Sequence, residues 1–266
     1  FNASCFDGAR CDVRSGGYEE CRDASIVIIT ASAPMNPATL NDRIQLLNSS
    51  KAIMKSIIAS IMLSGFNGIL IIVSNPVDIM TYYAYRLSGL PRERVIGSGT
   101  TLDSIRLREY IGKNFDVDTK SIFCQVIGEH GSSSVPVLSH CLVGGQKLED
   151  AFSKSEEKRK SKEEFIQATV EAGFDIFRKK GNTSYGIASS VAEIVKAIVF
   201  DEQRVLPVCY TLKGEYSLKD LSISVPCVLG EKGVKEVIEL SLSKEEEQAF
   251  YTSAEKLYAY DSSLEE

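Results

Sequence analysis

The chemistry available to this chain is concentrated at few positions, because its 266 residues include only two histidines. His130 stands between glycines in Ile127-Gly-Glu-His-Gly131, directly after a predicted buried strand. Glycines allow a sharp backbone turn, so the imidazole can be presented to a cleft, where it would act as a general acid and base. The alternative is a turn histidine held by its neighbours. His140 has an ordinary strand context, which predicts a structural role.

Asp103 and Arg106 form the second candidate group, in the segment Thr100-Thr-Leu-Asp-Ser-Ile-Arg106. A helix beginning there would place both side chains on one face. A carboxylate beside an imidazole fixes its tautomer and raises its pKa, and an arginine one turn away can bind a substrate carboxylate through two hydrogen bonds. A bare Asp-x-x-Arg pattern also describes a surface ion pair. The flanking Gly-Ser-Gly-Thr-Thr favours the functional interpretation.

The elements that would position these residues start with alternating strands and helices. Residues 25–31 and 68–74 are apolar runs rich in β-branched residues, typical of parallel strands that are covered on both faces. Over residues 42–62 apolar side chains recur at helical spacing, and residues 77–87 predict a further helix. The order strand, helix, strand, helix predicts a βαβ unit.

Beyond residue 97 this alternation stops, which predicts a second, different domain. Helices are expected there over residues 102–115, 185–200 and 245–258. A further helix should follow the charged segment 153–164 and end near Lys180. The strands expected there cover residues 121–128, 135–143 with a hairpin turn at Gly144-Gly145, 205–212 and 221–229. The predicted fold class is α/β, with a partial Rossmann-type parallel sheet in residues 1–98 and an α+β catalytic and substrate domain in residues 99–266.

Composition narrows the classes of function. The formal charge is -6, with 30 Lys and Arg against 36 Asp and Glu, the wrong sign for a protein that binds nucleic acid through its phosphates. No apolar run approaches the roughly 20 residues that cross a bilayer, so no membrane partner is expected. Seven cysteines without a Cys-x-x-Cys pair predict free thiols in a reducing compartment, hence a cytoplasmic protein. Four of them lie in apolar stretches and should be buried: Cys124, Cys141, Cys209 and Cys227.

Three segments together resemble the L-lactate/malate dehydrogenase superfamily. They are Val73-Ser-Asn-Pro-Val-Asp78, Ile96-Gly-Ser-Gly-Thr-Thr-Leu-Asp-Ser-Ile-Arg106 and Ile127-Gly-Glu-His-Gly131, which stand in the family's order. The resemblance starts at Tyr18 and runs nearly to the C-terminus. It implies an NAD-dependent oxidoreductase that interconverts an L-2-hydroxy acid and its 2-oxo acid by hydride transfer, assembled as a homodimer or homotetramer.

The same resemblance implies a role for each motif residue. His130 would donate and accept the proton, Asp103 would be its partner, and Arg106 would bind the substrate carboxylate. Asn75 would contact the nicotinamide and the substrate oxygen, and Thr183 would lie beside the substrate side chain. The residues expected to contact the cofactor are Ser32, Ala33, Val73 and Asn75. No metal site is implied.

The family also carries an arginine on a mobile loop, and its position depends on the alignment. Aligning from Ile29-Thr-Ala31 places Asn41 in that role. Aligning from the following helix, which runs without a gap from Arg43 to Ile57, places Arg43 there, and this alignment is preferred. This alignment implies that the loop is about two residues longer than in the family, because it starts from the pattern of the following helix.

Met35 lies in this loop, where lactate enzymes usually carry Gln and malate enzymes Arg. Met offers an adaptable apolar surface, whereas an arginine would compensate a second substrate carboxylate. With Met35 and the longer loop, the sequence resembles the L-2-hydroxyisocaproate dehydrogenase branch, which takes larger apolar 2-oxo acids. Malate is therefore disfavoured, and lactate is not excluded.

The sequence departs from the family at the cofactor site. It contains no G-x-G-x-x-G after a strand and no acidic residue about 20 positions further on, which would hold the pyrophosphate and ribose. We expect the first half of the Rossmann domain, roughly 60 to 80 residues, to precede Phe1. If the chain truly is this short, it would expose one side of a parallel sheet, and cofactor binding should fail. The choice between NAD and NADP stays open.

A catalytically inactive homologue that acts as a binding or structural protein is the alternative from another class. The presence of His130, Asp103, Arg106 and Arg43 argues against it.

Overall fold

The computed structural model describes residues 12–32, 43–153 and 161–262, except for the side chains of residues 43–46, 153, 174, 177, 261 and 262. The strands are β1 (Ile26–Ile29), β2 (Ile69–Ile72), β3 (Val95–Gly97), β4 (Ile122–Phe123), β5 (Val126–Gly128), β6 (Ser134–Pro136), β7 (Leu142–Val143), β8 (Gln146–Lys147), β9 (Arg204–Lys213), β10 (Lys219–Gly230) and β11 (Gly233–Val237). The α-helices are α1 (Arg43–Leu63), α2 (Val77–Ser88), α3 (Thr101–Phe115), α4 (Leu148–Ser153), α5 (Lys162–Lys180), α6 (Ser184–Val199) and α7 (Lys244–Ser262).

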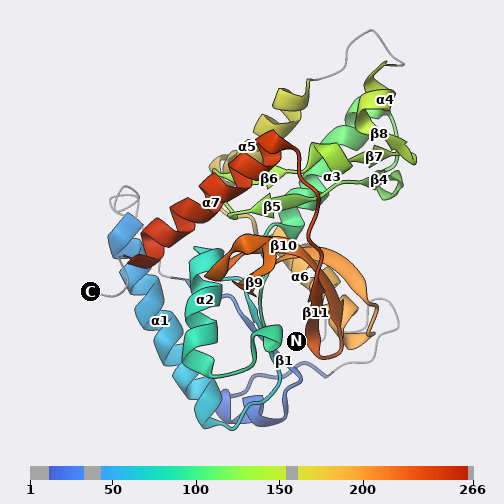
Figure 1. Cartoon of the computed structure of the whole chain (residues 1–266). Coiled ribbons are helices and arrows are strands. Elements are labelled where there is room, and N and C mark those ends of the chain that lie inside the picture. Colours follow the sequence, from blue (N-terminus) through green and yellow to red (C-terminus); the bar gives the residue numbers. More distant parts are fainter. Residues whose placement is uncertain (1–11, 33–42, 154–160, 263–266) are drawn as a thin grey trace.

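An eight-stranded mixed sheet forms the centre of the described chain, in the order β1-β2-β3-β9-β10-β5-β6 with β11 paired to β10. β4, β7 and β8 form a separate small sheet. Figure 1 shows α1 and α2 side by side and α7 passing over their ends towards β5 and β6. The C-terminal helix therefore bridges elements from both predicted domains.

The first strands form the predicted parallel unit. Ile26 pairs with Ile69 and Leu70 with Val95, both in parallel register. All four residues of β2 are buried, as expected for a strand with helices or neighbouring structure over both faces. The predicted order of strand, helix, strand and helix is confirmed, with bounds that shift by one or two residues.

The parallel strands continue directly into the antiparallel ones. Gly97 of β3 pairs with Cys209 of β9, and a Cβ atom on Gly97 would lie only 2.3 Å from Oγ1 of Thr81. Only glycine permits that close approach between α2 and the strand. Ile71 of the parallel part and Val225 of β10 belong to one hydrophobic core. The two regions therefore share a sheet and a core, and the domain boundary at residues 98 and 99 stays a prediction.

One strand prediction is wrong. Residues 121–128 were expected to form a single strand, but Ile122–Phe123 pairs with β7 whereas Val126–Gly128 pairs with β6 and β10. The chain changes sheets because its apolar residues serve two cores. Cys124 packs in a smaller cluster around Leu107 and Phe165, and Ile127 packs in the main core. A pattern of apolar residues alone does not show which of the two hydrophobic clusters each residue joins.

Residues 135–143 differ from the predicted strand in a similar way. His140 lies in a 3-10 helix, not in a strand, and its Nε2 is 2.8 Å from the carbonyl oxygen of Ser241. The turn at Gly144-Gly145 does join a hairpin, in which Leu142 pairs with Lys147. β11 was missed, because its five residues have no clear alternation.

The four cysteines expected to be buried are buried and free. A search of the described helices finds none that is long and apolar enough to span a membrane.

Candidate active site

The carboxyl ends of β1 and β2 meet at one edge of the sheet. Ile29 pairs with Ile72, and Ser32 and Asn75 each follow one of these residues by three positions. Both are exposed, and Val73 is half-buried. Open parallel sheets bind ligands outside the carboxyl ends of their strands. Three of the four residues expected to contact a cofactor, Ser32, Val73 and Asn75, therefore lie at or just beyond this edge.

His130, Asp103 and Arg106 form one connected group. Nδ1 of His130 is 2.7 Å from Oδ2 of Asp103, and Nη1 of Arg106 is 3.3 Å from Oδ1 of the same carboxylate. The Asp103 and Arg106 side chains are only 10% and 12% exposed, which is not the environment of a surface ion pair. The His130 side chain is 27% exposed, so it can reach both the carboxylate and solvent. The structure thus brings together the three residues that the motifs singled out.

The first turn of α3 is tied to the strand that leads to His130. The Thr100 hydroxyl donates to the carbonyl oxygen of Val126 at 2.5 Å, and the Val126 N–H donates to Oγ of Ser104 at 2.8 Å. Asp103 lies between Thr100 and Ser104 in the sequence, and Val126 begins β5. The distance between carboxylate and imidazole is therefore set by two short hydrogen bonds between their parent elements.

The backbone at His130 is anchored from two helices. The N–H of Glu129 donates to Oγ of Ser253 at 2.7 Å, and the N–H of His130 donates to Oδ2 of Asp78 at 2.9 Å. Lys256 adds an ion pair of 2.6 Å to the Glu129 carboxylate. Sequence reasoning missed these roles. Asp78 ends the motif Val73-Ser-Asn-Pro-Val-Asp78. Ser253 and Lys256 lie more than a hundred positions from His130 and carry no local signal.

The charges around the pair favour a protonated imidazole. Burial acts to lower the pKa of His130, but the charge of Asp103 and the hydrogen bond to it outweigh this and raise the pKa from 6.5 to about 9. Burial acts to raise the pKa of Asp103, but His130 and Arg106 hold it below its ordinary value. Because Asp103 is ionised, Nδ1 of His130 is the donor in their hydrogen bond, and Nε2 is the nitrogen left to exchange a proton with a substrate.

Helices α5 and α6 lie close to this group. A Cβ atom on Gly173 of α5 would be 3.4 Å from Nη1 of Arg106, and one on Gly186 of α6 would be 3.3 Å from Leu102. Thr183 is half-buried at the start of α6, one turn before that contact. Its predicted place near the substrate therefore fits the position of its helix.

Several predicted site residues cannot be placed. Ala33, Met35 and Asn41 lie outside the described residues, and Arg43 is described only by its backbone, as the first residue of α1. Within the described ranges, no group of three or more His, Cys, Asp or Glu side chains could hold a metal ion.

A buried carboxylate that joins an imidazole to an arginine, beside the ligand-binding edge of a parallel sheet, defines an acid–base site for a small carboxylate. Comparison with known proteins agrees with this class. Residues 2–97 match the lactate/malate dehydrogenase NAD-binding domain, and residues 100–263 match the alpha/beta C-terminal domain of the same family. The chain belongs to the lactate/malate dehydrogenase family.

Individual relatives support this assignment. L-lactate dehydrogenase 2 of Bacillus anthracis is 43% identical over 246 residues, which are 92% of this chain and 78% of the relative. L-lactate dehydrogenase 1 of Bacillus cereus is 45% identical with the same coverage. A crystal structure of the minor L-lactate dehydrogenase from Enterococcus mundtii, in the ligands-bound form, is 39% identical with a TM-score of 0.89, and covers 95% of this chain and 80% of that one.

Proposed function

We propose that this chain catalyses the NAD-dependent interconversion of an L-2-hydroxy acid and its 2-oxo acid. The observation that supports this most directly is the Asp103 carboxylate, which contacts His130 with one oxygen and Arg106 with the other. This arrangement places a proton donor beside a group that can bind a substrate carboxylate. The domain boundary at residues 98 and 99, near the junction of the two family matches, would put the proton-transfer machinery in the second domain.

The described residues fit one end of the cofactor. Asn75 is an exposed amide at the carboxyl edge of the sheet, and Asp78, three residues later, contacts the backbone of His130. Asn75, Val73 and Ser32 would therefore hold the nicotinamide end, with Ala33 beside them in the sequence. NADH, when bound, supplies the hydride that reduces the keto carbon.

The chain's own groups supply the proton and the electrostatics. The imidazolium of His130 would give the proton on Nε2 to the carbonyl oxygen, and Asp103 would stabilise the charge on the ring and hold its tautomer. Arg106 would bind the substrate carboxylate with its planar guanidinium. We assign to Arg43 the stabilisation of negative charge that develops on the carbonyl oxygen. Thr183 would lie beside the substrate side chain.

The pH dependence should follow His130. Reduction needs the protonated imidazole, and the raised pKa keeps that form dominant up to about pH 9. We expect kcat/KM for 2-oxo acid reduction to stay level up to that pH and then to fall about tenfold per pH unit. Oxidation of the 2-hydroxy acid needs neutral His130 and should rise with pH towards the same midpoint. Steady-state profiles in both directions test this, and a midpoint near the ordinary 6.5 would contradict it.

The proposed substrate is pyruvate, which is the 2-oxo acid of lactate, or a larger apolar 2-oxo acid, because Met35 stands in the specificity loop. Each added methylene gains about 0.8 kcal/mol when fully buried and less when partly buried. We expect kcat/KM with NADH to be highest for 2-oxoisocaproate, roughly tenfold lower for pyruvate, and lowest for oxaloacetate, whose second carboxylate would be desolvated without an assigned cation.

A substrate panel on the full-length protein tests both the activity and its specificity. Preference for pyruvate would contradict the larger-substrate proposal and leave a lactate dehydrogenase activity. Preference for oxaloacetate would indicate malate chemistry and an unassigned basic residue. Failure of the full-length protein to bind NADH in a fluorescence titration, with no turnover of any of the three acids, would overturn the activity in favour of a binding homologue.

We further propose a cytoplasmic location, supported by the free state of the described cysteines, and a homodimer or homotetramer, supported by the family resemblance. The partner is a small 2-oxo or 2-hydroxy acid rather than a nucleic acid or a membrane.

A further inference from the structure

We propose that Asp78 is a positioning residue for His130, which ties the imidazole to the helix turn that follows Asn75. This proposal rests on the proposed function, because it assigns His130 the proton transfer. Asp78 itself contacts neither nitrogen of the ring. It acts through the backbone, since Oδ2 accepts the N–H of His130 at 2.9 Å from 52 positions earlier in the sequence.

The position of Asp78 makes this contact a link between the two sides of the site. α2 starts at Val77, and its first turn is closed by the hydrogen bond from Met80 N–H to the Pro76 carbonyl at 2.9 Å. Asn75 directly precedes this turn. A shift of the nicotinamide-facing edge would therefore carry Asp78 and, through it, the peptide of His130. Hydride and proton must reach adjacent atoms of the substrate, so a fixed spacing between the two sides is what the reaction requires.

The neighbouring amide has its own anchor, so the peptide orientation is fixed at two points. Ser253 is fully buried and accepts the N–H of Glu129 at 2.7 Å. Gly128 has a φ of +88°, and a Cβ atom there would lie 2.9 Å from Oγ of Ser253. Two successive N–H groups that bind α2 and α7 determine the direction of the Cα–Cβ bond of His130. That direction decides whether Nδ1 reaches Asp103.

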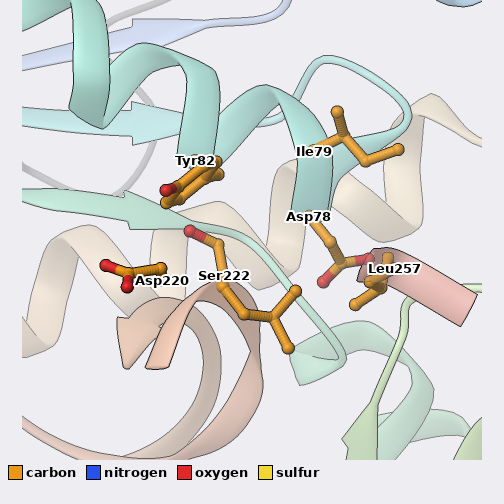
Figure 2. A pocket seen from close by; sticks show the side chains of 7 residues that line it. Asp78, Ile79, Tyr82, Asp220, Ser222 and Leu257 are labelled. Atoms are coloured by element: carbon orange, nitrogen blue, oxygen red, sulfur yellow. The ribbon is translucent and has the colours of Figure 1, made fainter. Parts of the chain in front are cut away.

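Asp78 is shielded from bulk solvent, which strengthens the hydrogen bond. The residue is 2% exposed, and Oδ1 has no hydrogen-bond partner among the described residues. Figure 2 shows its carboxylate beside Leu257 of α7, in a cavity of about 10 Å³ that Ile79 and Ser222 also line. Such a space holds at most about one water molecule. In a medium of low dielectric constant, an ionised acceptor binds an N–H more strongly than a neutral one.

The titratable groups that face Asp78 come from four elements. The loop after β5 contributes His130 and Glu129, and β9 contributes the thiol of Cys209, whose pKa is raised by burial and by the Asp78 charge. β10 contributes Asp220 and α2 itself contributes Tyr82, which line the same small cavity, whereas α7 contributes only the apolar Leu257. Burial raises the pKa of Asp78 itself to about 6, against the hydrogen bond from His130, so the carboxylate is mainly ionised at neutral pH. The hydrogen bond should therefore be charge-assisted under assay conditions.

The test separates positioning from charge and does not require the cofactor. The chain contains only two histidines, so histidine-labelled protein gives a simple NMR spectrum, which His140→Gln assigns. We expect a slowly exchanging, downfield Nδ1 proton from His130 in the unaltered chain and in Asp78→Asn, because the Asn oxygen still accepts the amide N–H. Asp78→Ala should lose this signal. Thr81→Val is the matched control, because Thr81 is equally buried one turn further along α2 and its hydroxyl donates to the Val77 carbonyl of its own helix.

Kinetics supply the second measurement. Asp78→Ala should lower kcat by roughly 100-fold, the cost of a misplacement of about 1 Å, with KM changed less than about threefold, while Asp78→Asn should stay within about tenfold of the unaltered chain. If circular dichroism shows that Asp78→Ala does not fold, Asp78→Leu keeps the branch at Cγ in a somewhat larger side chain without an acceptor. A preserved Nδ1 signal in Asp78→Ala or Asp78→Leu would overturn the proposal, and so would its loss in Asp78→Asn. If the unaltered full-length protein reduces no 2-oxo acid, the proposed function fails, but the NMR comparison still decides the role of Asp78.

Discussion

His130→Ala should lower kcat for 2-oxo acid reduction by at least ~100-fold, the low end of what general acid–base catalysis contributes. The reason is that Nδ1 of His130 is held by Asp103 at 2.7 Å, which leaves Nε2 to deliver the proton. Alanine removes the proton donor and leaves the carboxylate of Asp103 beside Arg106. The measurement is single-turnover reduction with NADH, which separates the chemical step from product release.

The other histidine provides the matched control. His140 lies in a 3-10 helix and contacts the Ser241 carbonyl, so His140→Ala should leave kcat within about twofold. NADH affinity should survive in both variants, because neither residue lies at the carboxyl edge of β1 and β2. Near-normal turnover in His130→Ala would remove this residue from the mechanism. Loss of NADH binding as well would mean that the substitution damages more than proton transfer.

Arg106→Lys should raise KM for the 2-oxo acid by about 10- to 150-fold, which corresponds to the roughly 1.5 to 3 kcal/mol of a charge-assisted hydrogen bond. The guanidinium has a planar fork that can contact both oxygens of a carboxylate, whereas the lysine ammonium is a point charge on a flexible stem. Arg106 is also held in place, with Nη1 at 3.3 Å from Asp103 and α5 packed near it. Lysine cannot reproduce both contacts at once.

Initial rates over a range of 2-oxo acid concentrations measure this effect, with saturating NADH. Arg92→Lys is the matched control, since Arg92 is 20% exposed and pairs with Glu215 at 2.9 Å, but on elements that carry no proposed site residue. It should leave KM unchanged, although it removes a comparable ion pair. An unchanged KM in Arg106→Lys would show that the substrate carboxylate binds elsewhere. A fall in kcat alone would instead assign Arg106 to the positioning of Asp103.

Local pattern was sufficient for most elements and for the composition of the site. α1, α2 and α3 begin and end within two residues of the predicted bounds, because an apolar repeat of 3.6 residues is a property of the sequence itself. Asp103 and Arg106 are three positions apart on α3, so their contact follows from helix geometry. The family motifs likewise indicate the α/β fold class and single out His130 as a candidate.

Contacts between distant segments required the tertiary structure. The anchoring of His130 by Asp78 and of Glu129 by Ser253 joins residues that are 52 and 124 positions apart. The division of residues 121–128 between two sheets had the same origin, because an apolar side chain is equally compatible with either core. Side-chain periodicity records only which face of an element is buried. The packing of the whole chain decides which surface covers that face and which backbone N–H meets which distant oxygen. The physical reason is that each buried polar group needs a partner wherever the fold can supply one.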